Sequence, residues 1–292
     1  MADKTTILLY GRTNSGKTAQ IGVLAEHIFR TMGKKTRLYT ADKGGTKTIQ
    51  PYIQLGIIEP IEIEGTDPWV FLNKAVKGLV RDAKSKWVPG DLSTIGMVAF
   101  ESFRSFAEEL LVWLAGRSAD GINIGGGSNI AFKVSDGGET LNIGGSNIAH
   151  YKVVQDRMTA EIWQSQKLPV PYVLWTSSIS KDEGQINAGK VLGPDVIGKA
   201  LTEEVPRWFT YTMRLDVLPA AQGKLERHLL YLGTHQDVTA GNATALGNIR
   251  QPLDAPALLK IVIEPADIVA AIAAIEGGCD PATDAIRKRC GL

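Results

Sequence analysis

The sequence predicts an α/β fold in which a mostly parallel central sheet is flanked by helices and carries a β-hairpin insertion. Short runs of β-branched and aromatic residues alternate along the chain with longer amphipathic segments, as in a parallel sheet covered by helices. The first run, at residues 5–10, leads through a glycine-rich turn directly into a helical segment. That strand–turn–helix junction identifies the edge of the sheet where a ligand is expected.

The individual elements follow from the same patterns. We expect strands at residues 5–10, 36–41, 57–63, 95–100, 171–177, 209–217 and 228–234. We expect helices at residues 16–32, 46–56, 67–84, 102–115 and 150–166. Asp67 and Pro68 predict the start of the third helix, because aspartate is a favoured N-cap and proline fits the first helical position.

Composition limits the class of protein. With 44% hydrophobic and 22% charged residues the chain is ordinary for a globular protein, and its net charge of +1 gives no global attraction to nucleic acid or membranes. Cys279 and Cys290 show neither metal-ligand spacing nor a disulfide framework. Neither an apolar leader nor a run of about 18 apolar residues is visible, so we expect a cytoplasmic protein, in the host cytoplasm if it is phage-encoded, with no membrane partner.

The predicted domain organisation is one elaborated domain over residues 1–254 and a C-terminal helical extension over residues 255–292. A chain of 292 residues exceeds the usual ~100 to 150 residues of one domain, but α/β folds often reach this length. The segment at 265–278 is too short and too rich in alanine to span a membrane, and an amphipathic helix fits it better.

The glycine-rich turn carries the most specific motif. Gly11, Gly16, Lys17 and Thr18 satisfy G-x-x-x-x-G-K-[ST], the phosphate-binding loop of P-loop nucleotidases. The glycines permit close approach of the backbone to phosphate, the lysine adds a positive charge near the β and γ phosphates, and the threonine hydroxyl would bind Mg²⁺. The alternative is a glycine-rich turn with an exposed lysine. The residues predicted to bind nucleotide here are Gly11, Thr13, Asn14, Ser15, Gly16, Lys17 and Thr18, with Lys17 also counted as catalytic.

Two acids end predicted strands at the same edge. Glu101 follows the buried run at 95–100, where nucleotidases place an acid that holds the Mg²⁺ hydration shell; it could also be a helix-start carboxylate favoured by the helix dipole. Asp42 follows the run at 36–41 and could activate the attacking water, or form an Asx turn before Gly44.

Hydroxyl side chains end another strand. Thr176, Ser177 and Ser178 would reach the same edge, where Ser177 could contact the terminal phosphate, or they could cap the strand end.

An insertion is predicted at about residues 121–149. The sequence GGSNIA occurs in it twice, at 126–131 and 144–149, and two alternating segments flank an Asp136-Gly137 turn typical of a β-hairpin. Both a decorative loop and a partner-binding arm fit this pattern.

Taken together, the segments YGRTNSGKT, LYTADKGG, MVAFESF and LGPDVIGKALTEEVPRWFTYTMRL resemble the RecA-type P-loop ATPase domain of bacteriophage nucleotide-binding proteins, from about Thr5 to Arg250. The resemblance implies a RecA-like fold with ATP and Mg²⁺ as cofactors, Asp42 as catalytic base and Glu101 as the Mg²⁺ acid. In that family the base is typically glutamate and the metal-binding acid is aspartate. Here the shorter aspartate, Asp42, stands at the position of the base and the longer glutamate, Glu101, at the position of the metal-binding acid. It also implies assembly into a homo-oligomer with ATP at the subunit contact, and a single-stranded DNA partner.

Three functions remain open from the sequence. The first is a Mg²⁺-dependent ATPase acting in phage-like DNA recombination or replication. The second is a nucleotide-binding assembly protein with weak or no hydrolysis, whose hairpin carries the interaction. The third is a P-loop kinase, although no arginine-rich lid is evident between the late strands. Basic residues are scattered rather than arranged in a stripe with aromatics, so the sequence adds no nucleic-acid motif of its own.

Overall fold

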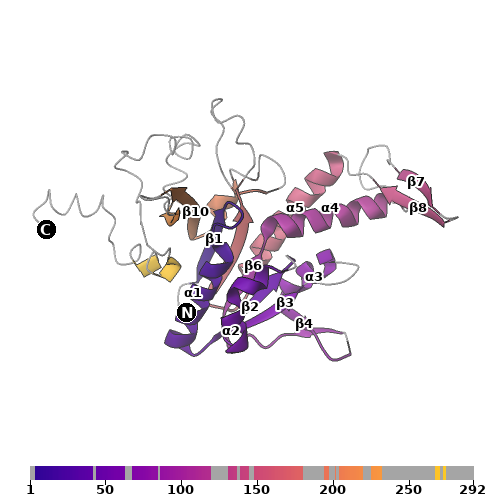
Figure 1. Cartoon of the computed structure of the whole chain (residues 1–292). Helices are drawn as coiled ribbons and strands as arrows, with labels where there is room; N and C mark the ends of the chain where they lie inside the picture. Colours follow the sequence, from indigo (N-terminus) through magenta and orange to yellow (C-terminus); the bar gives the residue numbers. More distant parts are fainter. Residues whose placement is uncertain are drawn as a thin grey trace, which may run out of the picture.

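The computed structural model describes residues 4–41, 44–62, 68–84, 86–119, 131–136, 139–144, 148–179, 194–196, 201, 204–219, 225–231, 267–269 and 272–273. Its centre is a seven-stranded sheet (Figure 1). The strands are β1 (Thr5–Gly11), β2 (Lys35–Thr40), β3 (Ile58–Glu62), β6 (Ile95–Glu101), β9 (Tyr172–Ser178), β10 (Tyr211–Pro219) and β11 (Leu225–Tyr231).

The strand order is β11-β10-β1-β9-β6-β2-β3. Every neighbouring pair is parallel except β10 and β11, which are antiparallel. Strand β1 therefore lies between two strands from late in the chain, whereas in the dinucleotide-binding fold the first strand lies beside the second. This order puts the loop after β1 next to the carboxyl end of β9, with β6 one strand further.

Helices cover both faces of the sheet. They are α1 (Lys17–Met32), α2 (Gln50–Gln54), α3 (Pro68–Ala75), α4 (Phe103–Ala119) and α5 (Ile148–Ser165), with short 3-10 helices η1 (Gly45–Ile49) and η3 (Val205–Trp208). Side chains alternate across the sheet: Ile7 and Leu9 join the hydrophobic cluster that includes α1, while Leu8 joins the cluster that includes α3, α4 and α5. The predicted α/β fold, with a mostly parallel sheet flanked by helices and a β-hairpin, is confirmed.

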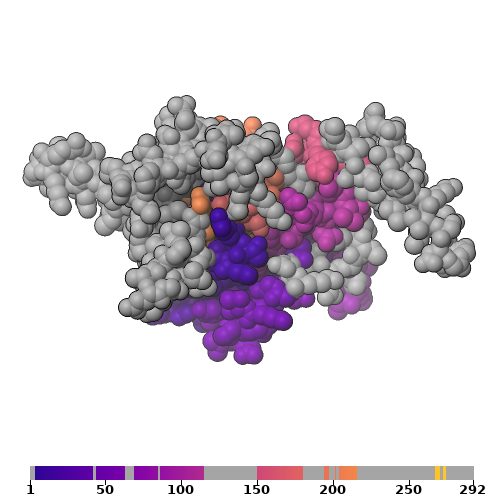
Figure 2. Space-filling view, turned by 45° about the horizontal axis from the view of Figure 1, so that its top comes forward, coloured from indigo at the N-terminus to yellow at the C-terminus, as the bar shows by residue number. Residues whose placement is uncertain are grey.

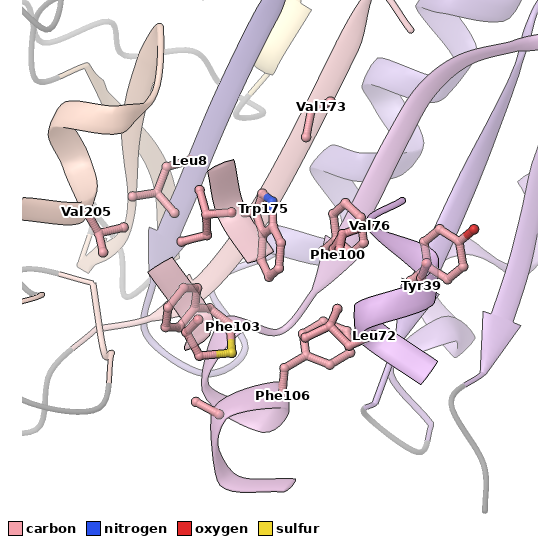
Figure 3. Packing of buried hydrophobic residues seen from close by; sticks show 14 of the residues in the cluster. Leu8, Tyr39, Leu72, Val76, Phe100, Phe103, Phe106, Val173, Trp175 and Val205 are labelled. Carbon is pink, nitrogen blue, oxygen red and sulfur yellow. The ribbon is translucent and has the colours of Figure 1, made fainter. Parts of the chain in front are cut away.

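Aromatic residues fill the core under α4. The ring of Trp175 on β9 stacks on Phe100 of β6 at 4.4 Å between centroids, and Phe103 and Phe106 from the start of α4 pack against the same indole at 5.8 and 6.0 Å (Figure 3). The indole N–H donates to Ser165 Oγ, which satisfies the only polar atom of that side chain. This cluster fixes the first turn of α4 relative to the ends of β6 and β9.

The helix expected over residues 67–84 is wrong in its second half. Helix α3 ends at Ala75, and residues 79–81 form β4 (Leu79–Arg81), antiparallel to β5 (Trp87–Pro89). Gly78 has a left-handed φ of 75°, the usual way for a helix to stop. Asp82 then stabilises the turn, since its Oδ1 accepts the N–H groups of Lys84 and Lys86. The segment at 46–56 is also more broken than expected, being η1 followed by α2.

The predicted hairpin is present. Strands β7 (Ala131–Asp136) and β8 (Glu139–Gly144) pair antiparallel, at the end of α4 and α5 away from the central sheet (Figure 1). Asp136 is the last paired residue of β7 and faces Glu139. The two connecting positions are therefore 137–138, one residue later than the expected Asp136-Gly137 turn.

Part of the C-terminal segment packs on the domain. Ile268 and Ile272 are buried in the cluster beside α1, and the N–H of Ile268 donates to Gln20 Oε1 at 2.8 Å. Residues 232–266 lie outside the described part of the chain, so the predicted boundary at residue 254 stays a prediction. Among the helices that the structure describes, none is long and apolar enough to cross a bilayer.

Candidate nucleotide-binding site

The glycine-rich turn is a tight loop between β1 and α1. Asn14 and Gly16 have positive φ values of 64° and 101°, and the N–H of Ser15 donates to Arg12 O at 3.1 Å. Asparagine and glycine are the residues that enter the left-handed region most easily. A backbone curled in this way ahead of a helix N-terminus presents N–H groups that bind phosphate.

The first glycine of the motif is required by the sheet itself. A Cβ on Gly11 would lie 2.3 Å from Leu215 O of β10 and 2.8 Å from Ser15 Oγ. Any side chain at position 11 would therefore separate β1 from β10 or distort the loop. Ser15 is fully buried under the loop, and its hydroxyl has no hydrogen-bond partner among the described residues.

A pocket of about 970 Å³ opens at this edge of the sheet. Its lining includes six of the residues predicted from the sequence: Thr13, Asn14, Gly16, Lys17, Thr18 and Glu101. The other predicted residues with described positions, Gly11, Ser15 and Ser177, are not part of the lining. In Figure 2 the indigo atoms of the N-terminal region reach the surface beside the purple atoms of the residues that follow them. The pocket lining combines the loop with residues of η1, β6, α4 and β9.

Lys17 lies folded over its own loop. Its Nζ donates to Gly11 O at 3.0 Å and to Arg12 O at 2.9 Å. These bonds hold the charged end of the side chain at the mouth of the loop, where a phosphate would compete with the two carbonyls for the same protons. Since a hydrogen bond between two charged groups is stronger than one to a neutral carbonyl, the amine can transfer to a phosphate.

Thr18 and Glu101 are in direct contact. The hydroxyl of Thr18 donates to Glu101 Oε1, although the two residues are 83 positions apart. Glu101 is only 4% exposed, and its carbonyl accepts the N–H of Ala41 from the end of β2; the peptide bond between Glu101 and Ser102 is cis. The carboxylate is thus held at the meeting point of β2, β6 and α1.

This oxygen pair fits a magnesium ion. Mg²⁺ prefers oxygen ligands and commonly binds through one or two protein groups together with substrate phosphates. Within the described part of the chain no group of three or more His, Cys, Asp or Glu residues could hold a metal by itself. Thr18 and Glu101 are the side chains that would hold Mg²⁺ here.

The serines at the end of β9 are placed differently from the expectation. Ser177 is fully buried, and its hydroxyl donates to Asp195 O at 3.0 Å and to Ser178 O at 3.2 Å. Ser178, which pairs with Gly11 in the sheet register, lines the pocket instead. Side chains alternate along a strand, so only one of two adjacent serines can face a ligand at the edge.

The structure adds basic and hydroxyl residues to the pocket that were not predicted from the sequence. Lys47 and Thr48 of η1, and Arg104 and Ser105 of α4, line the pocket. Lys17, Lys47 and Arg104 thus surround a space that among the described residues has one acidic lining residue, Glu101. No motif marks Lys47 or Arg104, and their proximity to two predicted strand ends is the only signal that could have found them. Asp42, the predicted base, lies outside the described residues, next to Ala41.

The structure is similar to solved structures of other proteins, one of which is described here. A KaiC-like protein from the hyperthermophilic archaeon Pyrococcus horikoshii matches over 79% of this chain and 79% of its own, with 13% sequence identity and a TM-score of 0.41. No protein-family model matches the sequence, and the search of curated proteins found no match.

Proposed function

We propose that this chain is a P-loop ATPase of the RecA type, which binds ATP with Mg²⁺ and hydrolyses it. The observation that carries the proposal is the contact between Thr18 and Glu101 inside the pocket. The sequence pattern of the loop and that of the strand ending at Glu101 each predict a ligand of the same metal, and a shared site requires their oxygens to be adjacent.

Each pocket group has a distinct task in this proposal. The loop backbone around Asn14 and Gly16 binds the phosphates, and Lys17 exchanges its two carbonyl partners for phosphate oxygens. Thr18 and Glu101 hold Mg²⁺, which neutralises phosphate charge when it is bound. Asp42 remains the proposed base, and Ser178 takes the position at the end of β9 that Ser177 was expected to fill.

Strand order supports the RecA-type assignment. Strand β9 lies between β1, which carries the loop, and β6, which carries Glu101. The resemblance of the sequence segments around Gly16, Asp42 and Glu101 to that family points the same way. On the same resemblance we propose that the protein acts in phage-like DNA recombination or replication, as a homo-oligomer that contacts single-stranded DNA, within the cytoplasm.

One experiment tests the activity directly. Phosphate release is measured with ATP and Mg²⁺, in the presence and absence of single-stranded DNA, while light scattering follows the mass with a non-hydrolysable ATP analogue. We expect Mg²⁺-dependent turnover that DNA stimulates, together with a nucleotide-dependent increase in mass. Turnover that Mg²⁺ removal leaves unchanged would contradict the proposed site.

The hairpin favours a second candidate, a nucleotide-dependent assembly protein with weak hydrolysis. Strands β7 and β8 lie at the far end of α4 and α5, away from the central sheet (Figure 1). No hairpin residue is among the described residues that line the pocket. This ribbon is the element that would contact another molecule in the second candidate function. Tight ATP binding and assembly without measurable turnover would favour this candidate over the ATPase.

A further inference from the structure

Arg104 is a pocket residue whose chemistry the proposed function has not used. It lies in the first turn of α4, lines the pocket, and is bonded to two carboxylates. Its Nε donates to Glu108 at 2.5 Å, and its Nη1 donates to Asp195 at 3.1 Å. We propose that Arg104 binds the terminal phosphate of the nucleotide and so makes the pocket selective for a triphosphate over a diphosphate. This inference rests on the proposed function.

The position of Arg104 is fixed by the core. Phe103 and Phe106 flank it in sequence, are buried, and pack against Trp175 of β9 (Figure 3). With 3.6 residues per turn, these two phenylalanines place Arg104 and Glu108 on another face of α4. The arginine therefore emerges from a rigid turn rather than from a mobile loop, with its guanidinium over the edge of the sheet.

Arg104 lies near the part of the pocket where Glu101 would hold Mg²⁺. It follows Glu101 by three residues, and Ser102 and Ser105 from the same turn line the pocket with it. If Mg²⁺ is bound, Thr18 and Glu101 would hold it together with phosphate oxygens, so the terminal phosphate is expected close to these two residues. A guanidinium beside them can form two parallel hydrogen bonds to the outer oxygens of that phosphate.

Asp195 ties Arg104 to the end of β9. The N–H of Asp195 donates to Ser178 O at 2.6 Å, and its carbonyl accepts the hydroxyl of Ser177 at 3.0 Å. The side chain of Asp195 is 16% exposed, whereas the side chain of Arg104 is 39% exposed. Asp195 is therefore the less exposed member of this ion pair, and it orients the guanidinium of Arg104 beside Ser178 at the edge of the pocket.

The two carboxylates compete with phosphate for the same donors. A guanidinium has five N–H groups, so Arg104 can add a phosphate while keeping one carboxylate. Ion pairs between partly exposed groups are weak because water screens them, whereas a triphosphate brings several negative charges into one pocket. We infer that the phosphate shares the guanidinium of Arg104 with Asp195, and that the negative charge of Asp195 lowers the affinity for the triphosphate.

Dissociation constants for ATP and ADP, measured with Mg²⁺ by titration calorimetry, test this inference. For Arg104→Gln we expect about a tenfold or larger loss of ATP affinity and less than about a twofold change for ADP. For Asp195→Asn we expect tighter ATP binding with ADP binding unchanged. Asp156→Asn is the matched control, because it makes the same chemical change in an ion pair on α5 that does not involve Arg104, and it should change both constants little.

Arg104→Lys guards against a folding defect, because it keeps the charge but loses the two-pronged geometry. It should lose part of the ATP affinity and keep the thermal unfolding temperature of the wild type. Equal losses for ATP and ADP, or none, in both arginine variants would overturn the role of Arg104. A wild-type protein that binds neither nucleotide would instead overturn the proposed function, so the two failures can be told apart.

Discussion

The hydroxyl of Thr18 donates a hydrogen bond to the carboxylate of Glu101, and this contact joins two motifs that the sequence places 83 residues apart. Thr18 lies in the first turn of α1, which follows β1 and the loop, and Glu101 ends β6. Strand β9 lies between β1 and β6 in the sheet. The backbone of Glu101 is fixed by a hydrogen bond from Ala41 N–H to Glu101 O. Because both oxygens suit Mg²⁺, their contact marks the point around which phosphates would be arranged.

Lys17→Ala should remove tight triphosphate binding. The side chain supplies the cation at the mouth of the loop, and hydrogen bonds to charged groups contribute roughly 1.5–3 kcal/mol, or about 10- to 150-fold in affinity. Titration of ATP with Mg²⁺ measures the loss. Lys84→Ala is the control, since Lys84 is exposed in the turn between β4 and β5. An unchanged affinity in Lys17→Ala would refute the phosphate-binding loop.

Glu101→Gln should weaken the dependence on Mg²⁺ more than it weakens folding. The amide keeps an oxygen that accepts the Thr18 hydroxyl, but it loses the negative charge that holds the metal. Mg²⁺ titrations of ATP binding, with thermal unfolding measured in parallel, separate the two effects. Glu26→Gln on α1, where the carboxylate pairs with Arg30, makes the same chemical change outside the pocket lining. If the Mg²⁺ titrations of Glu101→Gln and wild type coincide, the metal role is wrong.

Asp42→Asn should slow hydrolysis by at least ~10²-fold while ATP still binds, because a positioned general base contributes ~10² to 10⁴ to the rate. Asparagine keeps the size of aspartate but cannot accept the proton. Single-turnover measurements at saturating Mg²⁺ and ATP test this, with Asp156→Asn on the exposed part of α5 as the control. Equal rates for variant and wild type would remove Asp42 from the mechanism.

Deletion of residues 125–145 should leave nucleotide binding intact and impair contact between subunits or with a partner. The deleted segment contains β7 and β8, which pair with each other and not with the central sheet. ATP titration and light scattering on the deletion protein measure the two properties separately. A deletion protein that fails to fold would show that the hairpin contributes to the core of the domain.

Glu161→Gln should reduce the pH dependence of stability. Burial raises the pKa of Glu161, although the bond from Asn73 and the charges of Lys77 and Arg157 oppose the shift. The folded state therefore binds more protons than the unfolded state above pH 4.5, so Glu161 contributes stability that is complete below that pH and is lost as the pH rises through the folded pKa. Denaturant unfolding over this pH range should show a smaller slope for Glu161→Gln than for the wild type. Identical slopes in Glu161→Gln and wild type would contradict the prediction.

The sequence by itself determined the elements whose signals are local. The apolar run at 5–10, the glycines and lysine after it and the amphipathic stretch at 16–32 are consecutive, so β1, the loop and α1 could be predicted from spacing alone. The strand ends that carry Glu101 and Ser178 could be placed at one edge, because parallel strands end together. The prediction of a helix over residues 67–84 was wrong in its second half. Gly78 ends the helical segment and Asp82 forms the turn of the β4–β5 hairpin, but the amphipathic pattern was given more weight than these two local signals.

Only the tertiary structure decided which side chains share the pocket. Arg104 and Lys47 belong to it because β9 and β6 follow β1 in the sheet and η1 packs on α1, and neither relation is encoded in a local period. The choice of Ser178 over Ser177 depends on register, since a shift of one residue turns every side chain of a strand to the other face. Gly11 is required by the carbonyl of Leu215 on a neighbouring strand, a steric constraint that exists only after the chain has folded.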